Sequence, residues 1–571
     1  MTANFNKQAF YDAAELVASS EPGFAVEKQL IRGVEYKVFA NAPKTLRDVL
    51  ELCSHHGDAD FLVYEDERYT FREYYRLTHR VAERLIQNFG VKRGDPVAVL
   101  MRNAPEYPIL FMALASIGAV CVCLNSWWTV KELEYGLRDC QARLVFCDAT
   151  QSQKIEGLTE ILSIDTAVVR ELDGQKSAAF WEPLEQAAPL QPLDVALHSD
   201  DDFAIMYTSG SSGLPKGVVM THRGAISAIM TWLFGLKISA LLGWGAKPLT
   251  DSAGQACQPC ALVTTPFFHV SGTHPGILLS IWLGMKLVLL KKWDPQQAVE
   301  IVNREKVSRF AGVPTMSMEL IEAASLQGVT LDSLRNLDSG GANRPPEQVA
   351  LLAKVVPEAL VGTGWGMTET NGMGIGLRGK EFLLYPGAAG RLQVPLAEIK
   401  IVDEDNLPVA IGEVGELVFK CASNMRCYLN KPEETALALR DGWLYTGDLA
   451  RMNENDIISI VDRKKDIIIR GGENISCAEV HAALHLISGV KEAAVFSIPD
   501  HRLGETVGAC VHLQGGTQLS EAALKEAMKG YVATYKIPEK IWFRQEPLLR
   551  VGSGKIDRVA LRKACLKLTL E

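Results

Sequence analysis

Predicted helices and strands alternate along this chain from about residue 45 onward, and this alternation limits the folds that it can adopt. Residues 76–89 carry apolar side chains at helical spacing and end at Gly90, a common helix terminator. Residues 96–100 predict a buried strand, and a helix near 108–117 leads into a second strand at 119–124. Repeated helix–strand units favour parallel sheets that helices cover on both faces. We therefore predict an α/β fold built from layered βα units.

The chain is too long for one hydrophobic core, because 571 residues exceed the size at which single cores stop growing. The best boundary lies at the charged run that begins with Arg463. A shorter pattern follows it, with strands expected at 493–498 and 508–513. We predict a large N-terminal domain over residues 1–462 and a small, mobile α+β domain over residues 463–571.

Charge and cysteine usage exclude several classes of protein. A formal net charge of −9 argues against a nucleic-acid partner, because such proteins normally present a basic surface. The twelve cysteines are scattered among apolar residues, which indicates reduced, buried thiols rather than a disulfide framework. The lone pair Cys257 and Cys260 lacks the second pair that a zinc site needs.

The N-terminus shows no basic segment followed by an apolar core, so no signal peptide is expected. The uncharged run at 107–128 contains Pro108 and Gly118, and the run at 277–290 is cut by Lys286. Neither predicts a transmembrane segment. We expect a cytoplasmic protein, and a homodimer is left open.

A loop rich in glycine, serine and threonine at 207–217 follows the apolar run 203–206. Glycines let backbone amides approach a ligand, hydroxyls donate to phosphate oxygens, and Lys216 supplies positive charge, so this loop can wrap a polyphosphate. It is not a Walker A loop, because Pro215 stands where that motif needs glycine directly before its lysine. Residues 217–222 also predict a strand, whereas a Walker loop opens a helix. Alone, such a cluster is often a plain turn.

Further segments along the chain strengthen a nucleotide interpretation. Residues 364–369 place a hydroxyl and a carboxylate beside an aromatic ring, a set able to contact phosphate, metal and base. Residues 442–448 put Asp448 on a tight turn, where it could accept two sugar hydroxyls. The charged stretch 462–475 follows, and Lys555 comes last on a glycine-containing loop.

The order of these segments resembles the ANL superfamily of adenylate-forming enzymes, in its acyl-CoA synthetase (fatty-acid–CoA ligase-like) branch. The resemblance extends over about residues 45–560. It implies that a carboxylic acid reacts with ATP to give acyl-AMP and pyrophosphate, with Mg²⁺ as the metal. Coenzyme A then displaces AMP to give acyl-CoA.

The resemblance also implies which residues bind ATP. The β- and γ-phosphates would be held by Thr208, Ser209, Gly210, Ser211, Ser212, Gly213 and Lys216. Thr368 would contact the α-phosphate, Glu369 would bind Mg²⁺, and the ribose hydroxyls would be held by Asp448 and Arg463. The adenine would be flanked by Gly340, Gly341, Ala342, Trp365 and Gly366. Trp365 departs from the tyrosine that most relatives carry, which keeps a stacking surface and bears on the acyl pocket.

Other residues would serve catalysis and the second step. Lys555 resembles the catalytic lysine, although Val551 and Gly552 before it depart from the usual pattern. Lys465 resembles the hinge at which the small domain rotates. The CoA tunnel would be lined by Gly471, Gly472 and Glu473. His269 would lie near the acyl carboxylate and the thiol, with a buried core histidine as the alternative.

His269 also indicates which class of carboxylic acid the enzyme would activate. Amino-acid-activating relatives carry aspartate at the position of His269, where it pairs with the substrate ammonium, so an α-amino acid is disfavoured. No carrier domain follows the Lys555 loop, which favours free CoA as the acceptor. We expect a fatty or other apolar acid, aryl acids included. An enzyme that loads a separate carrier protein, a luciferase-type oxygenase and a non-catalytic nucleotide-binding relative remain alternatives.

Overall fold

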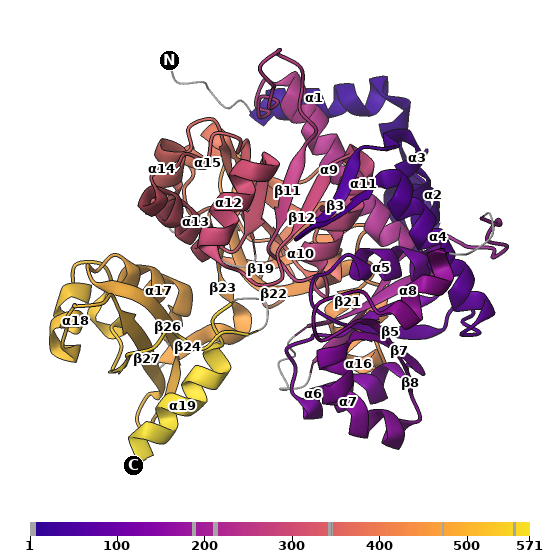
Figure 1. The fold of residues 1–571 in the computed structure, drawn as a ribbon. Coiled ribbons are helices and arrows are strands. Elements are labelled where there is room, and N and C mark those ends of the chain that lie inside the picture. The colour runs from indigo at the N-terminus through magenta and orange to yellow at the C-terminus, as the bar shows by residue number, and fades with distance from the viewer. Residues whose placement is uncertain are drawn as a thin grey trace. The chain divides into compact units, whose positions relative to one another are not determined.

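The computed structural model describes residues 7–185, 190–208, 215–340, 344, 346–470, 473–551 and 555–570. By contacts, the chain divides into two compact units (Figure 1). Unit 1 consists of Met1–Glu398 and Phe419–Leu444, and unit 2 consists of Ile399–Val418 and Tyr445–Glu571.

The first large sheet of unit 1 is mostly parallel. Its parallel strands are β5 (Pro96–Leu100), β6 (Val120–Cys123), β7 (Leu144–Asp148), β8 (Asp165–Arg170) and β9 (Asp202–Thr208). Two antiparallel strands extend it at one edge, β10 (Lys216–Thr221) and β20 (Cys427–Tyr428), in the order β20-β10-β9-β6-β5-β7-β8. The associated helices are α4 (Phe71–Gln87), α5 (Glu106–Ser116), α6 (Val130–Cys140), α7 (Ala149–Leu162) and α8 (Ala178–Glu185).

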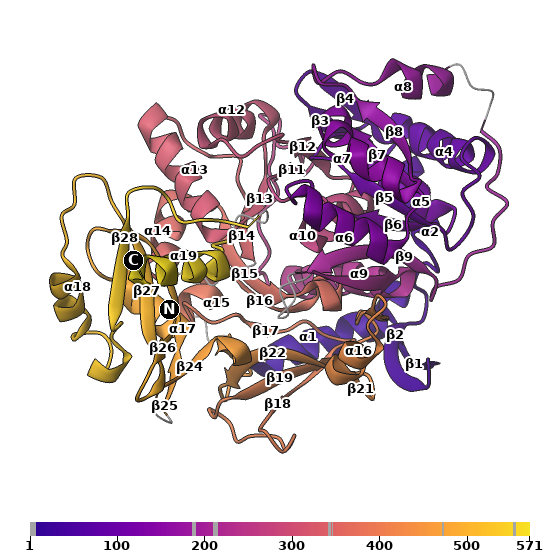
Figure 2. The same ribbon diagram turned by 90° about the horizontal axis from the view of Figure 1, so that it is seen from below.

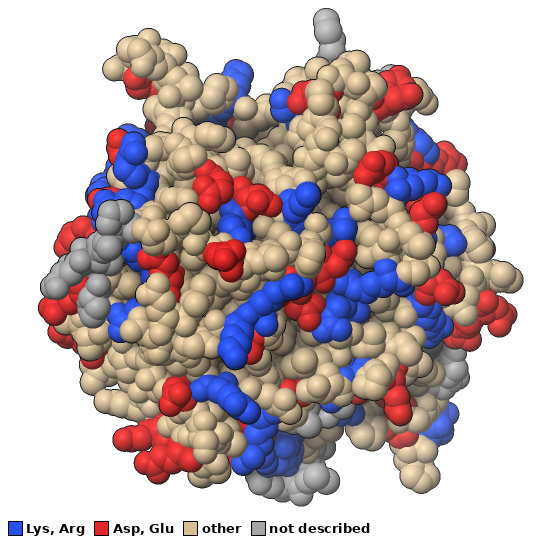
Figure 3. Space-filling view, turned by 90° about the vertical axis from the view of Figure 1, so that its right-hand side faces the viewer, with Lys and Arg blue, Asp and Glu red and all other residues tan. Residues whose placement is uncertain are grey.

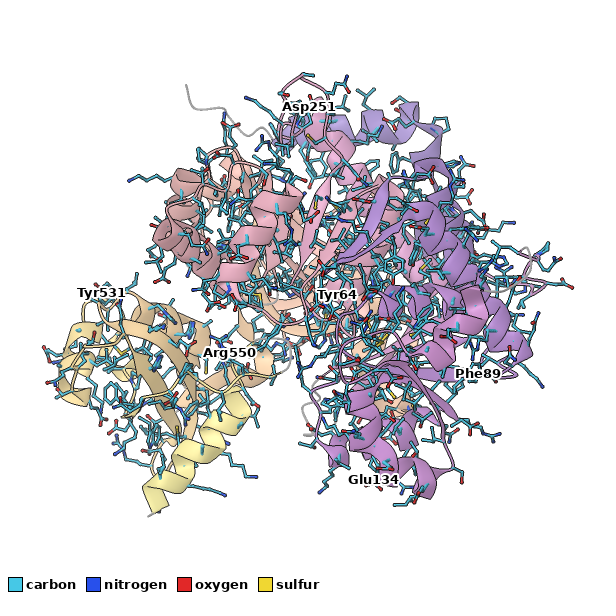
Figure 4. The ribbon with its side chains drawn as sticks, in the orientation of Figure 1. Tyr64, Phe89, Glu134, Asp251, Tyr531 and Arg550 are labelled. Carbon is cyan, nitrogen blue, oxygen red and sulfur yellow. The ribbon has the colours of Figure 1, made fainter. Side chains whose placement is uncertain are left out.

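The second large sheet of unit 1 is parallel through its centre. Its parallel strands are β3 (Asp60–Tyr64), β11 (Cys260–Val263), β12 (Lys286–Leu289), β13 (Arg309–Gly312), β14 (Asn336–Gly340) and β15 (Leu360–Gly366). The antiparallel strands at its edges are β4 (Glu67–Thr70), β16 (Gly374–Arg378) and β17 (Arg391–Leu392). The order is β17-β16-β15-β14-β13-β11-β12-β3-β4, and Tyr64 at the end of β3 is labelled in Figure 4.

Helices accompany this second sheet and include one irregular segment. They are α9 (His222–Leu241), α10 (Val270–Gly272), α11 (Leu279–Leu283), α12 (Pro295–Glu305), α13 (Pro314–Gln327), α14 (Pro346–Val355) and α15 (Gly379–Leu384). Figures 1 and 2 show α12, α13 and α14 gathered beside the sheet. A π-helix, η2 (Thr273–Leu278), joins α10 to α11, and a short 3₁₀ turn, η3 (Thr368–Thr370), follows β15.

The remaining elements of unit 1 lie at its two ends in sequence. They are α1 (Lys7–Ser20), η1 (Pro22–Phe24), β1 (Val26–Ile31), β2 (Val34–Phe39), α2 (Leu46–Glu51), α3 (Cys53–His56), α16 (Pro432–Ala438) and β21 (Leu439–Arg440). The start of α4 shows why a helix begins there. Thr70 accepts a hydrogen bond from the backbone N–H of Glu73, whose carboxylate in turn accepts from the N–H of Thr70.

Unit 2 contains a smaller α+β core. Its own sheet has the order β25-β24-β27-β26, with β28 on β27, and its strands are β24 (Ile467–Arg470), β25 (Glu473–Ser476), β26 (Val490–Asp500), β27 (Gly504–Leu513) and β28 (Lys540–Arg544). The associated helices and 3₁₀ turns are η4 (Lys464–Asp466), α17 (Cys477–His485), α18 (Glu521–Met528), η5 (Thr534–Lys536) and α19 (Arg558–Leu570). Buried Ile468, Val480, Leu484, Val495 and Val511 form the centre of its core. Tyr531, just beyond α18, and Arg550 are labelled in Figure 4.

The predicted α/β fold with a smaller second domain is confirmed. The predicted strands at 96–100 and 119–124 correspond to β5 and β6. The division by contacts differs from a boundary at residue 463, because residues 445–462 group with unit 2. The reason is pairing: β23 (Ile458–Arg463) runs antiparallel to the later part of β22 (Trp443–Met452), so the two cannot be separated. Strands β18 (Glu398–Val402) and β19 (Gly415–Lys420) each cross from one unit to the other. A functional boundary at Arg463 stays a prediction.

Cysteines and apolar helices were also predicted from sequence. All twelve cysteines fall in described parts of the chain and are free, and all but Cys257 and Cys427 are buried, as expected. Among the described helices, α9 has the length and composition of a membrane span, but 61% of its apolar window is buried inside the structure, as in a core helix. On the face shown in Figure 3, basic and acidic side chains lie next to each other. The absence of a nucleic-acid partner stays a prediction.

Candidate active site

The carboxyl ends of parallel strands carry most of the predicted unit 1 residues. Strands β11, β13, β14 and β15 are parallel neighbours, so the segments that follow them meet at one edge of the sheet. This edge is where open α/β sheets bind ligands. It brings together five predicted residues, which are His269, Gly340, Trp365, Thr368 and Glu369.

The predicted phosphate loop connects two antiparallel strands. Thr208 at the end of β9 pairs with Lys216 at the start of β10, so the strand expected after the loop is present. The side chain of Tyr135 donates a hydrogen bond to the carbonyl of Pro215 at 3.1 Å. Ser209, Gly210, Ser211, Ser212 and Gly213 lie outside the described residues.

One tyrosine joins the loop lysine to the predicted metal carboxylate. The Lys216 Nζ lies 4.9 Å from the ring centroid of Tyr428, and the Tyr428 hydroxyl donates to Glu369 Oε1 at 2.8 Å. Tyr428 and Glu369 are 9% and 6% exposed, so both are largely withdrawn from water. Burial, followed by the neighbouring Glu369 charge, raises the pKa of Tyr428, so its hydroxyl stays a proton donor.

The backbone around Tyr428 ties the same elements together. Met425 N–H donates to the carbonyl of Glu369, and Leu429 N–H donates to that of Gly217, each at 2.7 Å. Arg426 makes two hydrogen bonds to Asp202 of β9, at 2.7 and 2.8 Å. Residues 425–429 therefore form a strap between the Glu369 turn and the two strands of the phosphate loop.

The turn that carries Thr368 and Glu369 is held from its other side by Asn371. Asn371 has a left-handed φ of 56° and is fully buried. Its Oδ1 accepts from His274 Nε2 at 2.9 Å, and its Nδ2 donates to the carbonyl of Ser423 at 2.7 Å. Burial lowers the pKa of His274 to about 4, so this histidine is neutral, and its Nδ1 accepts from the Thr273 hydroxyl.

His269 stands directly before α10, and it is partly buried. Its ring lies 4.6 Å from that of Phe268, and Phe268 makes an edge contact with Trp127 at 5.2 Å. Asn103 fixes the preceding loop, since its Oδ1 accepts from Phe267 N–H and its Nδ2 donates to the Thr265 carbonyl, both at 2.9 Å. This environment is compatible with both roles that the sequence left open for His269.

The strand end that was predicted to flank adenine is braced by a buried arginine. Gly340 ends β14, and Arg344 Nε donates to the hydroxyl of Ser339 at 3.0 Å. Arg344 Nη2 also donates to Ser317 of α13 at 3.0 Å. Burial lowers the pKa of Arg344 to about 10. Gly341 and Ala342 lie outside the described residues.

Trp365 lies on β15 opposite Ile375 of β16, and it is partly exposed. Its ring makes an edge contact with Phe419 at 6.4 Å. Gly374 is required beside it, because a β-carbon there would lie 2.7 Å from Trp365 Cε3. Gly366 follows in an exposed position. The tryptophan therefore presents an accessible ring at the candidate edge of the sheet.

Unit 2 brings together the residues predicted to bind ribose. Asp448 of β22 lies directly opposite Arg463 of β23, and their charged groups are 3.3 Å apart. Glu416 of β19 accepts from Gly447 N–H at 3.1 Å and from Lys464 Nζ at 3.0 Å. One carboxylate thus holds both the turn before Asp448 and the residue after Arg463.

Lys555 lies near this pair. Its loop is closed by a backbone hydrogen bond from Val551 N–H to the Lys555 carbonyl at 2.8 Å and by an antiparallel bridge between Arg550 and Ile556. The pKa of Lys555 is lowered, first by desolvation and then by the Arg463 guanidinium, while Asp448 raises it. The Lys555 side chain is exposed, and its two charged neighbours come from β22 and β23.

The predicted hinge and tunnel residues are described in part. Lys465 lies within η4, between β23 and β24. Glu473 is the first residue of β25. Gly471 and Gly472 lie outside the described residues.

Five residues that hold these groups were missed from the sequence, namely Tyr428, Asn371, His274, Arg344 and Glu416. Four of them, Tyr428, His274, Arg344 and Glu416, lie outside the sequence segments that predict phosphate, metal or sugar chemistry. Asn371 offered the best signal, since it directly follows the Thr368–Thr370 segment and asparagine is common in left-handed turns.

The side chains near Glu369 indicate how the predicted Mg²⁺ could be bound. Within the described residues, no group of three or more His, Cys, Asp or Glu side chains gathers as a metal site. Mg²⁺ commonly binds through one or two carboxylates together with substrate phosphates. A buried Glu369, linked through Tyr428 to the phosphate-loop lysine, fits a magnesium ion that arrives with its nucleotide.

Comparisons with known proteins agree with this geometry. A family model described as AMP-binding enzyme matches residues 50–429, and one described as AMP-binding enzyme C-terminal domain matches residues 479–555. A long-chain-fatty-acid–CoA ligase of Bacillus subtilis (strain 168) is 32% identical over 548 residues, covering 90% of this chain and 93% of that protein. The 4-coumarate–CoA ligase 3 of Oryza sativa subsp. japonica is 31% identical over 507 residues, covering 87% of each.

A solved structure of an acyl-CoA synthetase also matches this fold. The o-succinylbenzoate CoA synthetase of Bacillus subtilis, solved with its acyl-adenylate intermediate, matches with a TM-score of 0.75 at 27% identity. The match covers 90% of this chain and 97% of that one. These matches show that the chain belongs to the AMP-binding enzymes of the ANL superfamily of adenylate-forming enzymes, among the acyl-CoA ligases.

Proposed function

We propose that this protein activates an apolar carboxylic acid with ATP and transfers the acyl group to coenzyme A. In the first step a carboxylate oxygen attacks the α-phosphorus, the bond to the β-phosphate breaks, and pyrophosphate leaves. In the second step the CoA sulfur attacks the acyl carbon, the bond to AMP breaks, and the thiol proton is lost. The products are acyl-CoA, AMP and pyrophosphate.

The observation that carries the proposal is the adjacency of Lys216, Tyr428 and Glu369 beside the phosphate-loop strands. A fixed cation and a buried carboxylate in one place suit a nucleotide polyphosphate together with its metal. The family match supports the same chemistry.

Each residue has a role in the first step. Thr208 and Lys216 would hold the β- and γ-phosphates, with the intervening loop. Thr368 would contact the α-phosphate, and Glu369 would hold Mg²⁺, which neutralises charge on the phosphates when bound. Asp448 and Arg463 would orient the ribose. Because an anion must approach a polyanion, the main contribution is electrostatic rather than proton transfer.

Lys555 would supply positive charge where the carboxylate meets the α-phosphate. Its proximity to Asp448 and Arg463 supports this role, because those residues would fix the ribose next to that phosphate. Lys465 would be the pivot at which the small domain turns between steps. Gly471, Gly472 and Glu473 would then line the passage for the CoA arm.

The acid is proposed to be fatty or aryl. His269 lies beside Phe268, which itself contacts Trp127, and this aromatic neighbourhood suits an apolar acid. The relatives named above act on a long-chain fatty acid and on 4-coumarate, so both apolar classes belong in the test.

A panel assay tests the proposal. Pyrophosphate release is measured with ATP, Mg²⁺ and short-, medium- and long-chain fatty acids, aryl acids, and alanine as an amino-acid control. We expect release with at least one apolar acid, acyl-CoA only when CoA is added, and no response to alanine. Silence across the apolar acids would overturn the proposed function.

A further inference from the structure

The Tyr428 side chain contacts two groups of opposite charge, the Lys216 ammonium and the Glu369 carboxylate. Lys216 Nζ lies over the ring at 4.9 Å from its centroid, and Glu369 Oε1 accepts the ring hydroxyl at 2.8 Å. The lysine contacts the face of the ring and the carboxylate contacts its hydroxyl end. Aromatic faces attract cations, while the hydroxyl donates to anions, so each end of the side chain suits its neighbour.

The tyrosine is itself held rigidly. Its backbone N–H donates to the Thr435 hydroxyl at 3.0 Å. Its place in β20 is also fixed, because Tyr428 pairs with Val218 of β10. Leu429 and Arg426 fix the strand on both sides of it, through Gly217 and Asp202. A ring fixed in this way can set the positions of the two groups that touch it.

We propose that Tyr428 is a positioning residue for Mg²⁺·ATP: it holds the Lys216 ammonium and the Glu369 carboxylate apart and aims each at its own part of the bound nucleotide. This inference rests on the proposed function, because it takes Lys216 as a phosphate ligand and Glu369 as the metal carboxylate. Without the ring, the two side chains can pair directly and become less available to the nucleotide.

Two substitutions separate the two ends of the side chain. Tyr428→Phe keeps the ring under Lys216 and removes the hydroxyl that holds Glu369. Tyr428→Leu removes both contacts. Tyr74→Phe is the matched control, since it deletes a fully buried hydroxyl that donates to the Pro108 carbonyl on another part of unit 1.

Binding is measured by titration calorimetry with Mg²⁺·ATP and, separately, with AMP, which lacks the β- and γ-phosphates. For Tyr428→Phe we expect the Mg²⁺ concentration that half-saturates ATP binding to rise about tenfold, the usual scale for a lost hydrogen bond to a charged group. For Tyr428→Leu, ATP affinity at saturating Mg²⁺ also falls by about fivefold, the scale of a lost cation–π contact. AMP affinity should stay within about twofold of wild type in both variants.

The AMP measurement distinguishes positioning from structural damage. If AMP and Mg²⁺·ATP affinities fall together, or if both variants bind Mg²⁺·ATP as wild type does, the inference is wrong. Failure of the wild-type protein to bind ATP at all would instead overturn the proposed function. Tyr74→Phe should change neither affinity.

Discussion

At the scale of single residues, the Glu369 turn depends on a glycine from a different element. Gly224 is the third residue of α9, and a β-carbon built on it would lie 2.7 Å from Asn371 Nδ2. Asn371 is not free to move away, because His274 and the Ser423 carbonyl hold its side chain. The glycine therefore leaves room for the amide that fixes the turn.

Gly224→Ala is expected to impair nucleotide use even though alanine favours helices. The new methyl would displace Asn371 and with it Thr368 and Glu369. We expect the rate of acid-dependent pyrophosphate release to fall about tenfold, since small misplacements at a site are costly. The measurement is the rate at saturating acid, together with the KM for Mg²⁺·ATP.

Gly235→Ala in the same helix is the matched control. A β-carbon there meets nothing within 4 Å, so this change should raise the free energy of unfolding by about 0.5–1 kcal/mol and leave turnover unchanged. Equal turnover in the two variants would show that Asn371 does not position the site.

The sequence motifs point to candidate chemistry-bearing residues but not to the residues that contact them. Lys216, Glu369, Asp448 and Lys555 stand in short motifs whose residue types match phosphate, metal and sugar chemistry. Tyr428 stands in a two-residue strand and gains its role only from neighbours far along the chain, Lys216 and Glu369. Local pattern carries no information about such contacts, because they arise from the tertiary fold.

At the scale of elements, the register of β22 and β23 positions the predicted ribose residues. Their antiparallel pairing sets Asp448 opposite Arg463, and Glu416 of β19 links Gly447 to Lys464. A slip by one residue would turn these side chains to the other face of the pair. The pairing thus couples the ribose site to the segment that contains the proposed pivot.

Among the elements, buried strands could be predicted from the sequence, whereas the extent of α9 and the π-helix could not. The strand at 96–100 was placed correctly, because a buried parallel strand is an uninterrupted apolar run. The Gly-, Pro-, Ala- and Ser-rich composition of residues 235–262 favours irregular structure, yet α9 continues to Leu241 before an irregular stretch leads to β11. Gly235 lies inside α9, although glycine disfavours the interior of a helix. The π-helix at Thr273–Leu278 could not be predicted from the apolar spacing and capping residues that indicate ordinary α-helices.

At the scale of the whole molecule, buried neutral histidines make the fold sensitive to acid. Burial lowers the pKa of His222 and of His274 to about 4, and desolvation together with the neighbouring His485 lowers that of the partly buried His481 to about 3. In the unfolded chain these groups have a pKa of about 6.5 and take up protons at higher pH. The unfolded state therefore binds more protons between these values, so stability falls as the pH drops from about 6.5 toward 4.

Each such histidine should cost about 1.4 kcal/mol at pH 5.5 relative to pH 7.5. His481→Leu removes one of them from unit 2, and His55→Asn replaces an exposed histidine as the control. Thermal unfolding at the two pH values should show a smaller loss of Tm for His481→Leu than for wild type. An unchanged loss in that variant would contradict the assignment.

The proposed reaction has two chemical steps, and Lys555 is proposed to act only in the first, the formation of acyl-AMP. The most direct test compares wild type with Lys555→Ala in the two half-reactions, using Lys563→Ala, an exposed lysine of α19, as the control. For Lys555→Ala we expect acid-dependent pyrophosphate release to fall by about 10²-fold or more, with thioester formation from supplied acyl-AMP and CoA within about twofold of wild type. Equal loss in both half-reactions, or no loss in the first, would contradict an adenylate-forming reaction driven by Lys555.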